Sequence, residues 1–103
     1  MNITETIESE RRKWKNAENL NVKTVEDINN GYCKQFAKGV KDVAVDGVRI
    51  RTHDFDETYS SFAHAWIEFN GKHYDAECPE GVENPEELPF FKRNDIEPEI
   101  SSI

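Results

Sequence analysis

The strongest constraint on the fold lies in residues 62–77, where two runs of strand-forming residues flank Asn70-Gly71. The first run, residues 62–69, reads FAHAWIEF, and the second, residues 72–77, reads KHYDAE. An Asn-Gly pair between such runs is the strongest short-range signal for a β-hairpin, because both residues tolerate the positive φ of a two-residue turn. The sequence therefore predicts an antiparallel hairpin here.

Helical periodicity precedes the hairpin. An apolar stripe at helical spacing over residues 33–44 comprises Cys33, Phe36, Ala37, Val40 and Ala44. The pattern predicts a helix that begins close to Cys33, with Asn30 as its N-cap and Asp46-Gly47 as its stop. We therefore expect Cys33 in the first turn of a partly buried helix.

Two more helical segments are predicted nearer the N-terminus. Residues 3–18 predict a helix capped by Thr4, with acidic residues early and basic residues late. Its apolar face comprises Ile3, Ile7 and Trp14. Thr24 followed by Asp27 resembles a capping box and predicts a short helical turn.

After Gly47, apolar residues recur at every second position. Alternation over residues 48–53 predicts a half-exposed strand, whose outward positions are Arg49, Arg51 and His53. Residues 54–61 are polar and predict a loop. Helices followed by a meander of strands indicate the α+β class.

Residues 79–103 are acidic and hold all four prolines of the chain, which excludes a long element there. Residues 84–88 predict one helical turn, and Phe90 and Phe91 are expected to pin this tail to the core. We expect one domain over residues 1–103, with its core at about residues 22–78.

Length and charge exclude several classes of protein. The chain has 103 residues, enough for one domain with a small core. Its 13 basic and 21 acidic residues give a formal net charge of −8, with no basic stripe to displace counterions from nucleic acid. No apolar run approaches the roughly 20 residues of a membrane-spanning helix, and no signal peptide is recognisable. We therefore expect a cytoplasmic monomer that binds neither nucleic acid nor membranes.

Two cysteines, Cys33 and Cys78, fit neither a disulfide framework nor the paired spacing of a zinc site. His53, Asp54 and Asp56 are better explained by a polar loop than by a metal site, and we expect no metal or cofactor. In a reducing compartment, a lone Cys with a His elsewhere is a candidate nucleophile.

The hairpin register brings a histidine and two carboxylates together. A two-residue turn puts His64 opposite Glu77 and makes Asp75 its diagonal neighbour on the same face. Backbones at a diagonal position lie roughly 7–8 Å apart, within reach of a side-chain hydrogen bond. A carboxylate there can hold one imidazole nitrogen and stabilise the imidazolium. Asp75 is the first candidate for this role, and Glu77 is an alternative.

This arrangement predicts nucleophilic chemistry at Cys33. Unpaired backbone N–H groups and the helix dipole stabilise a thiolate at a helix start. His64 would act as the base, and the backbone N–H of Cys33 could donate to an oxyanion. The reaction class is acyl transfer through a thioester.

Three segments resemble the core of the transglutaminase-like superfamily: GYCKQFA at 31–37, HAWIE at 64–68 and YDA at 74–76. The resemblance covers about residues 29–78. It implies a papain-like α+β core, in which N-terminal helices, with the Cys at a helix start, pack on a small antiparallel sheet. It also implies that Cys33 is the nucleophile, His64 the base and Asp75 the orienting acid.

One position departs from the papain-type pattern. Papain-type enzymes carry a Gln six residues before the Cys as an oxyanion donor, and Asp27 stands there in this chain. The candidates for oxyanion or substrate binding are Trp14, Asn29, Asn30 and Trp66. Trp66 is also expected to pack under the site.

The function that we expect is hydrolysis of an amide or peptide bond in a peptide or protein substrate. The alternative is a catalytically degenerate transglutaminase-like module that uses the same cleft to bind a partner or ligand. A metal site built from Cys33, His64 and Asp75 is disfavoured, because three such residues scattered along the sequence are also the pattern of a catalytic triad.

Overall fold

The computed structural model describes residues 2–16, 24–44, 46–53, 63–98 and 101–102. Its elements, in chain order, are α1 (Ile3–Lys15), α2 (Val25–Asn29), α3 (Cys33–Val43), β1 (Arg49–His53), β2 (His64–Phe69), β3 (Lys72–Asp75), β4 (Cys78–Val82), η1 (Pro85–Glu87, a 3-10 turn), α4 (Pro89–Asn94) and β5 (Ser101–Ser102). The predicted α+β class is confirmed. The predicted loop at 54–61 and the end of the first predicted helix, residues 17–18, lie outside the described residues.

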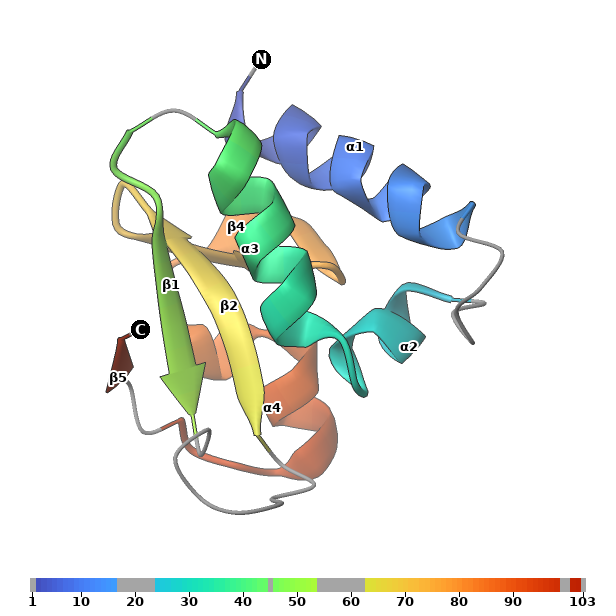
Figure 1. Ribbon diagram of the computed structural model, residues 1–103. Helices are drawn as coiled ribbons and strands as arrows, with labels where there is room; N and C mark the ends of the chain where they lie inside the picture. The colour runs from blue at the N-terminus through green and yellow to red at the C-terminus, as the bar shows by residue number, and fades with distance from the viewer. Residues whose placement is uncertain (1, 17–23, 45, 54–62, 99–100, 103) are drawn as a thin grey trace.

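The described strands form one antiparallel sheet in the order β4-β3-β2-β1-β5. In Figure 1, α3 runs alongside β2 and passes in front of β4, and α1 lies beside α3. Helix α4 lies behind the sheet in this view. The sheet is thus covered by helices from both sides.

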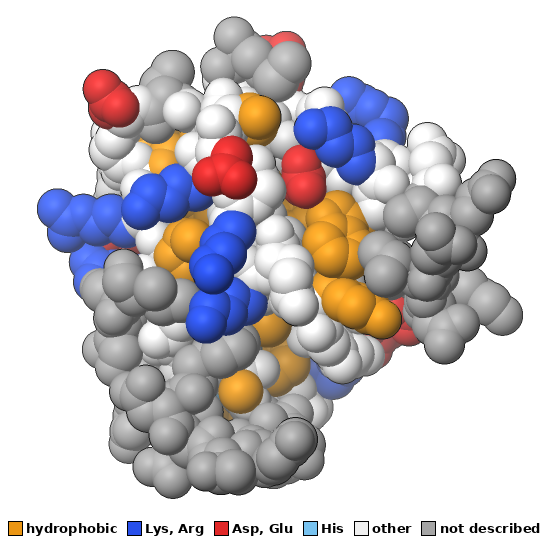
Figure 2. Space-filling model, in the orientation of Figure 1, with side chains coloured by type: hydrophobic (Ala, Val, Ile, Leu, Met, Phe, Trp, Pro, Cys, Tyr) orange, Lys and Arg blue, Asp and Glu red, His pale blue; other side chains and the backbone are white. Residues whose placement is uncertain are grey.

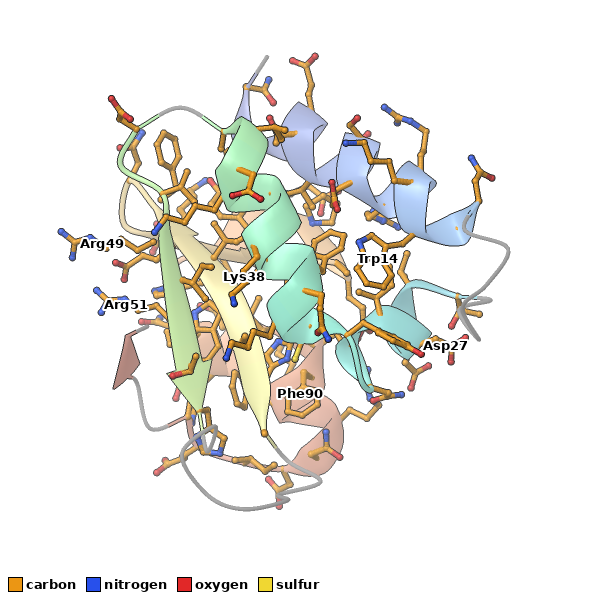
Figure 3. All side chains as sticks on the ribbon, in the orientation of Figure 1. Trp14, Asp27, Lys38, Arg49, Arg51 and Phe90 are labelled. Carbon is orange, nitrogen blue, oxygen red and sulfur yellow. The ribbon has the colours of Figure 1, made fainter. Side chains whose placement is uncertain are left out.

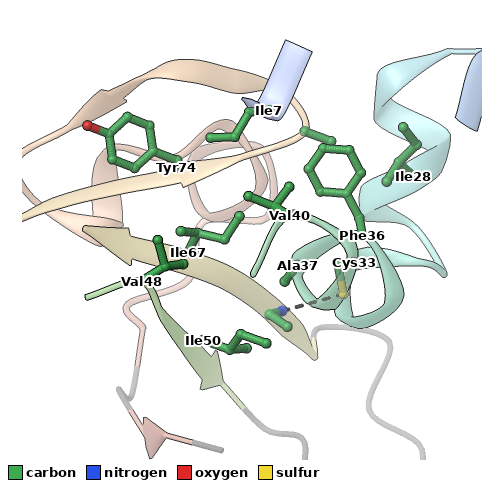
Figure 4. Packing of buried hydrophobic residues seen from close by; sticks show 12 residues of the cluster. Ile7, Ile28, Cys33, Phe36, Ala37, Val40, Val48, Ile50, Ile67 and Tyr74 are labelled. Atoms are coloured by element: carbon green, nitrogen blue, oxygen red, sulfur yellow. Dashed lines mark hydrogen bonds between the residues drawn. The ribbon is translucent and has the colours of Figure 1, made fainter. Parts of the chain in front are cut away.

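Alternation along β2 divides the core between these two sides. Ala65 and Ile67 belong to the cluster around α3, together with Cys33 and Phe36 (Figure 4). The neighbouring position Trp66 belongs to a second cluster. This second cluster also contains Leu88, Phe90 and Phe91. Successive strand residues point to opposite faces, so β2 contributes side chains to both cores.

The predicted register of the hairpin is confirmed. Phe69 pairs with Lys72, and Glu68 pairs with His73. Asn70 and Gly71 both have positive φ, as the two-residue turn requires. Strand β3 ends at Asp75, and residues 76–77 turn into β4. Because of this turn, Glu77 does not take the strand position opposite His64.

The helix caps differ in part from the predictions. Asn2, not Thr4, caps α1, with its Oδ1 accepting from the N–H of Glu5 at 2.8 Å. The capping box of Thr24 and Asp27 is present at the start of α2. Asn30 is the C-cap of α2, and Tyr32 occupies the N-cap position of α3 without a side-chain hydrogen bond. Helix α3 therefore begins at Cys33 without a side-chain cap.

The core extends beyond residues 22–78 at both ends. Ile7 of α1 is fully buried in the first cluster, and the predicted tail supplies the strand β4 and the helix α4. Phe90 and Phe91 pin this segment to the sheet, as expected. His53, expected to face outward, is buried because its ring meets that of Phe91 edge-on at 5.5 Å.

Two glycines, one in the turn between β2 and β3 and one in β4, allow a stability prediction. Gly71 and Gly81 both have positive φ, but a Cβ would meet open space at Gly71 and the Tyr74 ring at Gly81. We expect Gly71→Ala to lower the free energy of unfolding by about 1 kcal/mol through backbone strain alone. Gly81→Ala should lower it by about 2 kcal/mol, because the ring must also move. Urea unfolding of both variants measures the difference, and equal losses would contradict a role for the Tyr74 contact.

Candidate active site

His64 and Asp75 form a buried hydrogen-bonded pair. The Nε2 atom of His64 lies 2.9 Å from Oδ2 of Asp75, and the residues are 0% and 2% exposed. The other carboxylate oxygen, Oδ1, accepts the backbone N–H of Glu77 at 2.9 Å. Both oxygens of Asp75 are therefore engaged, and the diagonal contact predicted from the hairpin register is present.

Cys33 is the first residue of α3, and it meets β2 beside His64. Its sulfur accepts the backbone N–H of Ala65 at 3.4 Å (Figure 4), and the residue is 6% exposed. The N–H groups of a first helical turn have no acceptor within their own helix. Because Ala65 follows His64 directly, this hydrogen bond brings the start of α3 to the residue that carries the imidazole.

The second imidazole nitrogen, Nδ1, is buried, and among the described residues it has no hydrogen-bond partner. The Cys33 thiol is nevertheless close enough to the ring to influence its protonation. Asp75 thus uses one nitrogen of His64 and leaves the other for Cys33.

The surroundings of His64 favour its charged form. Burial alone would lower the pKa of the imidazolium. The hydrogen bond to Asp75, the closeness of the Cys33 thiol and the charges of both groups outweigh burial and raise the pKa from 6.5 to about 9. At neutral pH His64 is therefore an imidazolium, which suits a thiolate partner.

Aromatic rings fix the plane of the imidazole. The Phe90 ring stacks on it with centroids 4.3 Å apart and an interplanar angle of 13°. Phe91 meets it edge-on at 5.5 Å, and Trp66 stacks at 5.9 Å. In Figure 3, Phe90 lies near the start of β2, close to the start of α3. Sequence reasoning predicted that Phe90 and Phe91 would be buried but missed their contact with His64.

The four candidates for oxyanion or substrate binding differ in their surroundings. Trp14 donates its indole N–H to Oε2 of Glu10 at 3.1 Å, and it lies apart from Phe90 in Figure 3. Trp66 is fully buried and donates to Nδ1 of His73 at 3.0 Å. These two indole N–H groups are therefore already committed.

The two asparagines also differ. Asn30 is exposed at the end of α2. Asn29 is 2% exposed and donates from Nδ2 to Oε1 of Glu77 at 2.9 Å, and its Oδ1 has no partner among the described residues. It lies four residues before Cys33 and retains hydrogen-bonding capacity. Among the four candidates, Asn29 thus combines a buried side chain with an amide that its hydrogen bonds in the described part of the chain only partly use.

Glu77, the alternative to Asp75, has a different role in the structure. Its carboxylate binds Asn29 and the guanidinium of Arg93, and only its backbone N–H contacts Asp75. Arg93 was not recognised in the sequence, because a single arginine in an acidic segment carries no motif. These contacts leave Asp75 as the carboxylate that holds His64.

The second cysteine has less reactive surroundings. Cys78 is half-buried, and burial together with the charge of Asp75 raises the pKa of its thiol. No group of three or more potential ligands in the described part of the chain could hold a metal ion. Asp54 and Asp56 of the predicted loop lie outside that part.

Positive charge gathers near α3 despite the acidic composition. In Figure 2, Lys and Arg side chains cluster over α3 and β1. Lys34 follows Cys33 directly, and Lys38 is exposed one turn later. Helix α3 itself carries three lysines and one aspartate.

The chain matches no protein-family model, and no curated protein or solved structure is significantly similar to it. The resemblance to the transglutaminase-like superfamily therefore stays a prediction that depends on the residues and their geometry. None of the described helices is long and apolar enough to cross a membrane.

Proposed function

We propose that this protein is a cysteine-dependent acyl-transfer enzyme of transglutaminase-like type, which hydrolyses an amide or peptide bond through a thioester. One observation carries the proposal: the buried imidazole of His64 is bound to Asp75 through Nε2, and its Nδ1, beside Cys33, has no hydrogen-bond partner in the described part of the chain. These contacts support the roles of nucleophile for Cys33, base for His64 and orienting acid for Asp75.

The reaction would proceed in two steps. The Cys33 thiolate attacks the carbonyl carbon and forms a C–S bond, and His64 gives its proton to the amine nitrogen as the C–N bond breaks. Water then attacks the thioester, and His64 accepts a proton from it. Release of the carboxylic acid breaks the C–S bond and restores the thiolate beside the imidazolium, and the released acid then gives its remaining proton to solvent. Asp75 holds the ring through both steps.

The start of α3 would stabilise the oxyanion formed in each step. The backbone N–H of Cys33 belongs to the first turn, where it has no acceptor within the helix. The amide of Asn29 could supply a second donor, because only one of the two hydrogens on Nδ2 is needed for Glu77.

A second candidate function is a binding module without catalytic activity. Its support is the burial of the site: Cys33 is only 6% exposed, and Phe90 stacks on His64. A substrate carbonyl would reach the sulfur only if the surrounding side chains moved. The two candidates differ in the reactivity that they require of the thiol.

Alkylation by iodoacetamide, followed by intact mass and peptide mapping, separates them. An ordinary thiol is about 0.3% thiolate at about pH 6, so Cys33 paired with His64 should react about tenfold or more faster than Cys78 there. The Cys33→Ser variant should lose this labelling and the Cys78→Ser variant should keep it. If Cys33 reacts only in alkaline solution, as an ordinary thiol does, the enzyme proposal fails and the binding module is favoured.

Acyl transfer itself is tested with p-nitrophenyl acetate. We expect a burst of p-nitrophenol and an acetyl thioester on Cys33 that is visible in the intact mass. Labelling without any acyl adduct would indicate an activated thiol that does not perform the transfer.

A further inference from the structure

Glu77 connects three separate parts of the molecule at the back of the candidate site. Its backbone N–H binds Oδ1 of Asp75 at 2.9 Å. Its carboxylate accepts from Nδ2 of Asn29 at 2.9 Å and from both terminal nitrogens of Arg93 at 3.0 Å. Asn29 precedes Cys33 by four residues, so the turn after β3 is tied to the segment that leads into α3.

Arg93 brings α4 into the same network. Its bidentate pairing with Glu77 is the geometry that gives guanidinium–carboxylate pairs their strength. Its Nε also lies 3.3 Å from Glu26, but that side chain is half exposed, so solvent weakens the contact. Three residues earlier on α4, Phe90 stacks on His64. The ion pair therefore anchors the helix that covers the imidazole.

Within this network, the carboxylates of Glu77 and Asp75 compete for the guanidinium of Arg93. Arg93 also interacts with the charge of Asp75, the carboxylate that binds His64. If Glu77 did not neutralise Arg93, the guanidinium would attract Asp75 and weaken its hold on the ring. Because Glu77 neutralises Arg93, the negative charge of Asp75 can stabilise the His64 imidazolium.

We propose that Glu77 and Arg93 are positioning residues for the acyl transfer, in which Glu77 occupies Arg93 so that Asp75 stays bound to His64. The proposal rests on the proposed function for its catalytic meaning. The hold of Asp75 on His64 can be measured whether or not the protein is an enzyme.

The decisive experiment is an NMR titration of the His64 ring in four forms of the full chain: wild type, Glu77→Gln, Arg93→Gln and the double variant. Glu77→Gln keeps the size of the side chain but removes its charge, and it should lower the titration midpoint of His64 by about one pH unit. The double variant should restore the midpoint, because no unpaired guanidinium remains. Glu83→Gln and Lys92→Gln alter exposed charges nearby and serve as matched controls.

Restoration in the double variant separates this role from a merely structural one. Loss of a structural contact would make the double variant at least as perturbed as Glu77→Gln. An unchanged midpoint in Glu77→Gln, or no restoration, overturns the proposal. If wild-type Cys33 lacks enhanced labelling, the proposed function fails, and the titration still decides the role of Glu77.

Discussion

Replacement of Asp75 by Asn is expected to lower the rate of acyl transfer about a thousandfold or more. A neutral amide does not stabilise the imidazolium of His64. An amide that donates to Nε2 would also place the ring proton on Nδ1, so the nitrogen beside Cys33 could no longer accept one. Single-turnover release of p-nitrophenol from p-nitrophenyl acetate measures the loss.

The matched control for this prediction is Asp42→Asn, which removes the same charge from an exposed position on α3. It should change the rate by less than about twofold, since exposed charges contribute little. A melting curve of Asp75→Asn checks that the fold survives. A folded Asp75→Asn protein with a rate within tenfold of wild type would remove Asp75 from the mechanism.

The titration of His64 by itself should make the free energy of unfolding fall steeply between about pH 6.5 and pH 9. Its pKa in the folded protein, about 9, lies above its ordinary value of 6.5, so the folded state binds the proton more tightly. The resulting stabilisation is complete below pH 6.5 and is lost as the pH rises through about 9. The difference corresponds to on the order of 3 kcal/mol. Urea unfolding across this range measures it.

The His64→Gln variant provides the comparison for this prediction, because its stability should be nearly flat over the same range. His73 does not interfere, since burial lowers its pKa and it therefore reduces stability at lower pH. Cys78, with its raised pKa, adds a loss only in more alkaline solution, and it does so equally in wild type and variant. Parallel curves for the two proteins would contradict a charged His64 at neutral pH.

The part of the site that could be predicted depends on local geometry. Asn70-Gly71 sets the hairpin register, and the register places Asp75 diagonally across from His64. The helical spacing that begins at Cys33 likewise places the thiol at a helix start. These relations follow from the periods of strands and helices, which can be counted directly in a sequence.

The remainder depends on contacts between distant segments. The turn at residues 76–77 redirects Glu77 away from His64, and the strand pattern does not reveal where β3 stops. The stacking of Phe90 on His64 and the burial of His53 both require that α4 dock behind the sheet. A single sequence records that Phe90 is apolar, but not which ring it will meet.

The division of the core by the sheet has a consequence for the newly made chain. Cys33 is packed in the cluster in front of the sheet, whereas the imidazole of His64 contacts Phe90 and Phe91 of the cluster behind it. The proposed activation of the Cys33 thiol by His64 would therefore require that both layers have docked on β2. A half-folded or proteolysed chain would carry only an inert thiol. The appearance of fast alkylation at Cys33 during refolding would therefore mark the time at which the second of the two clusters packs against β2.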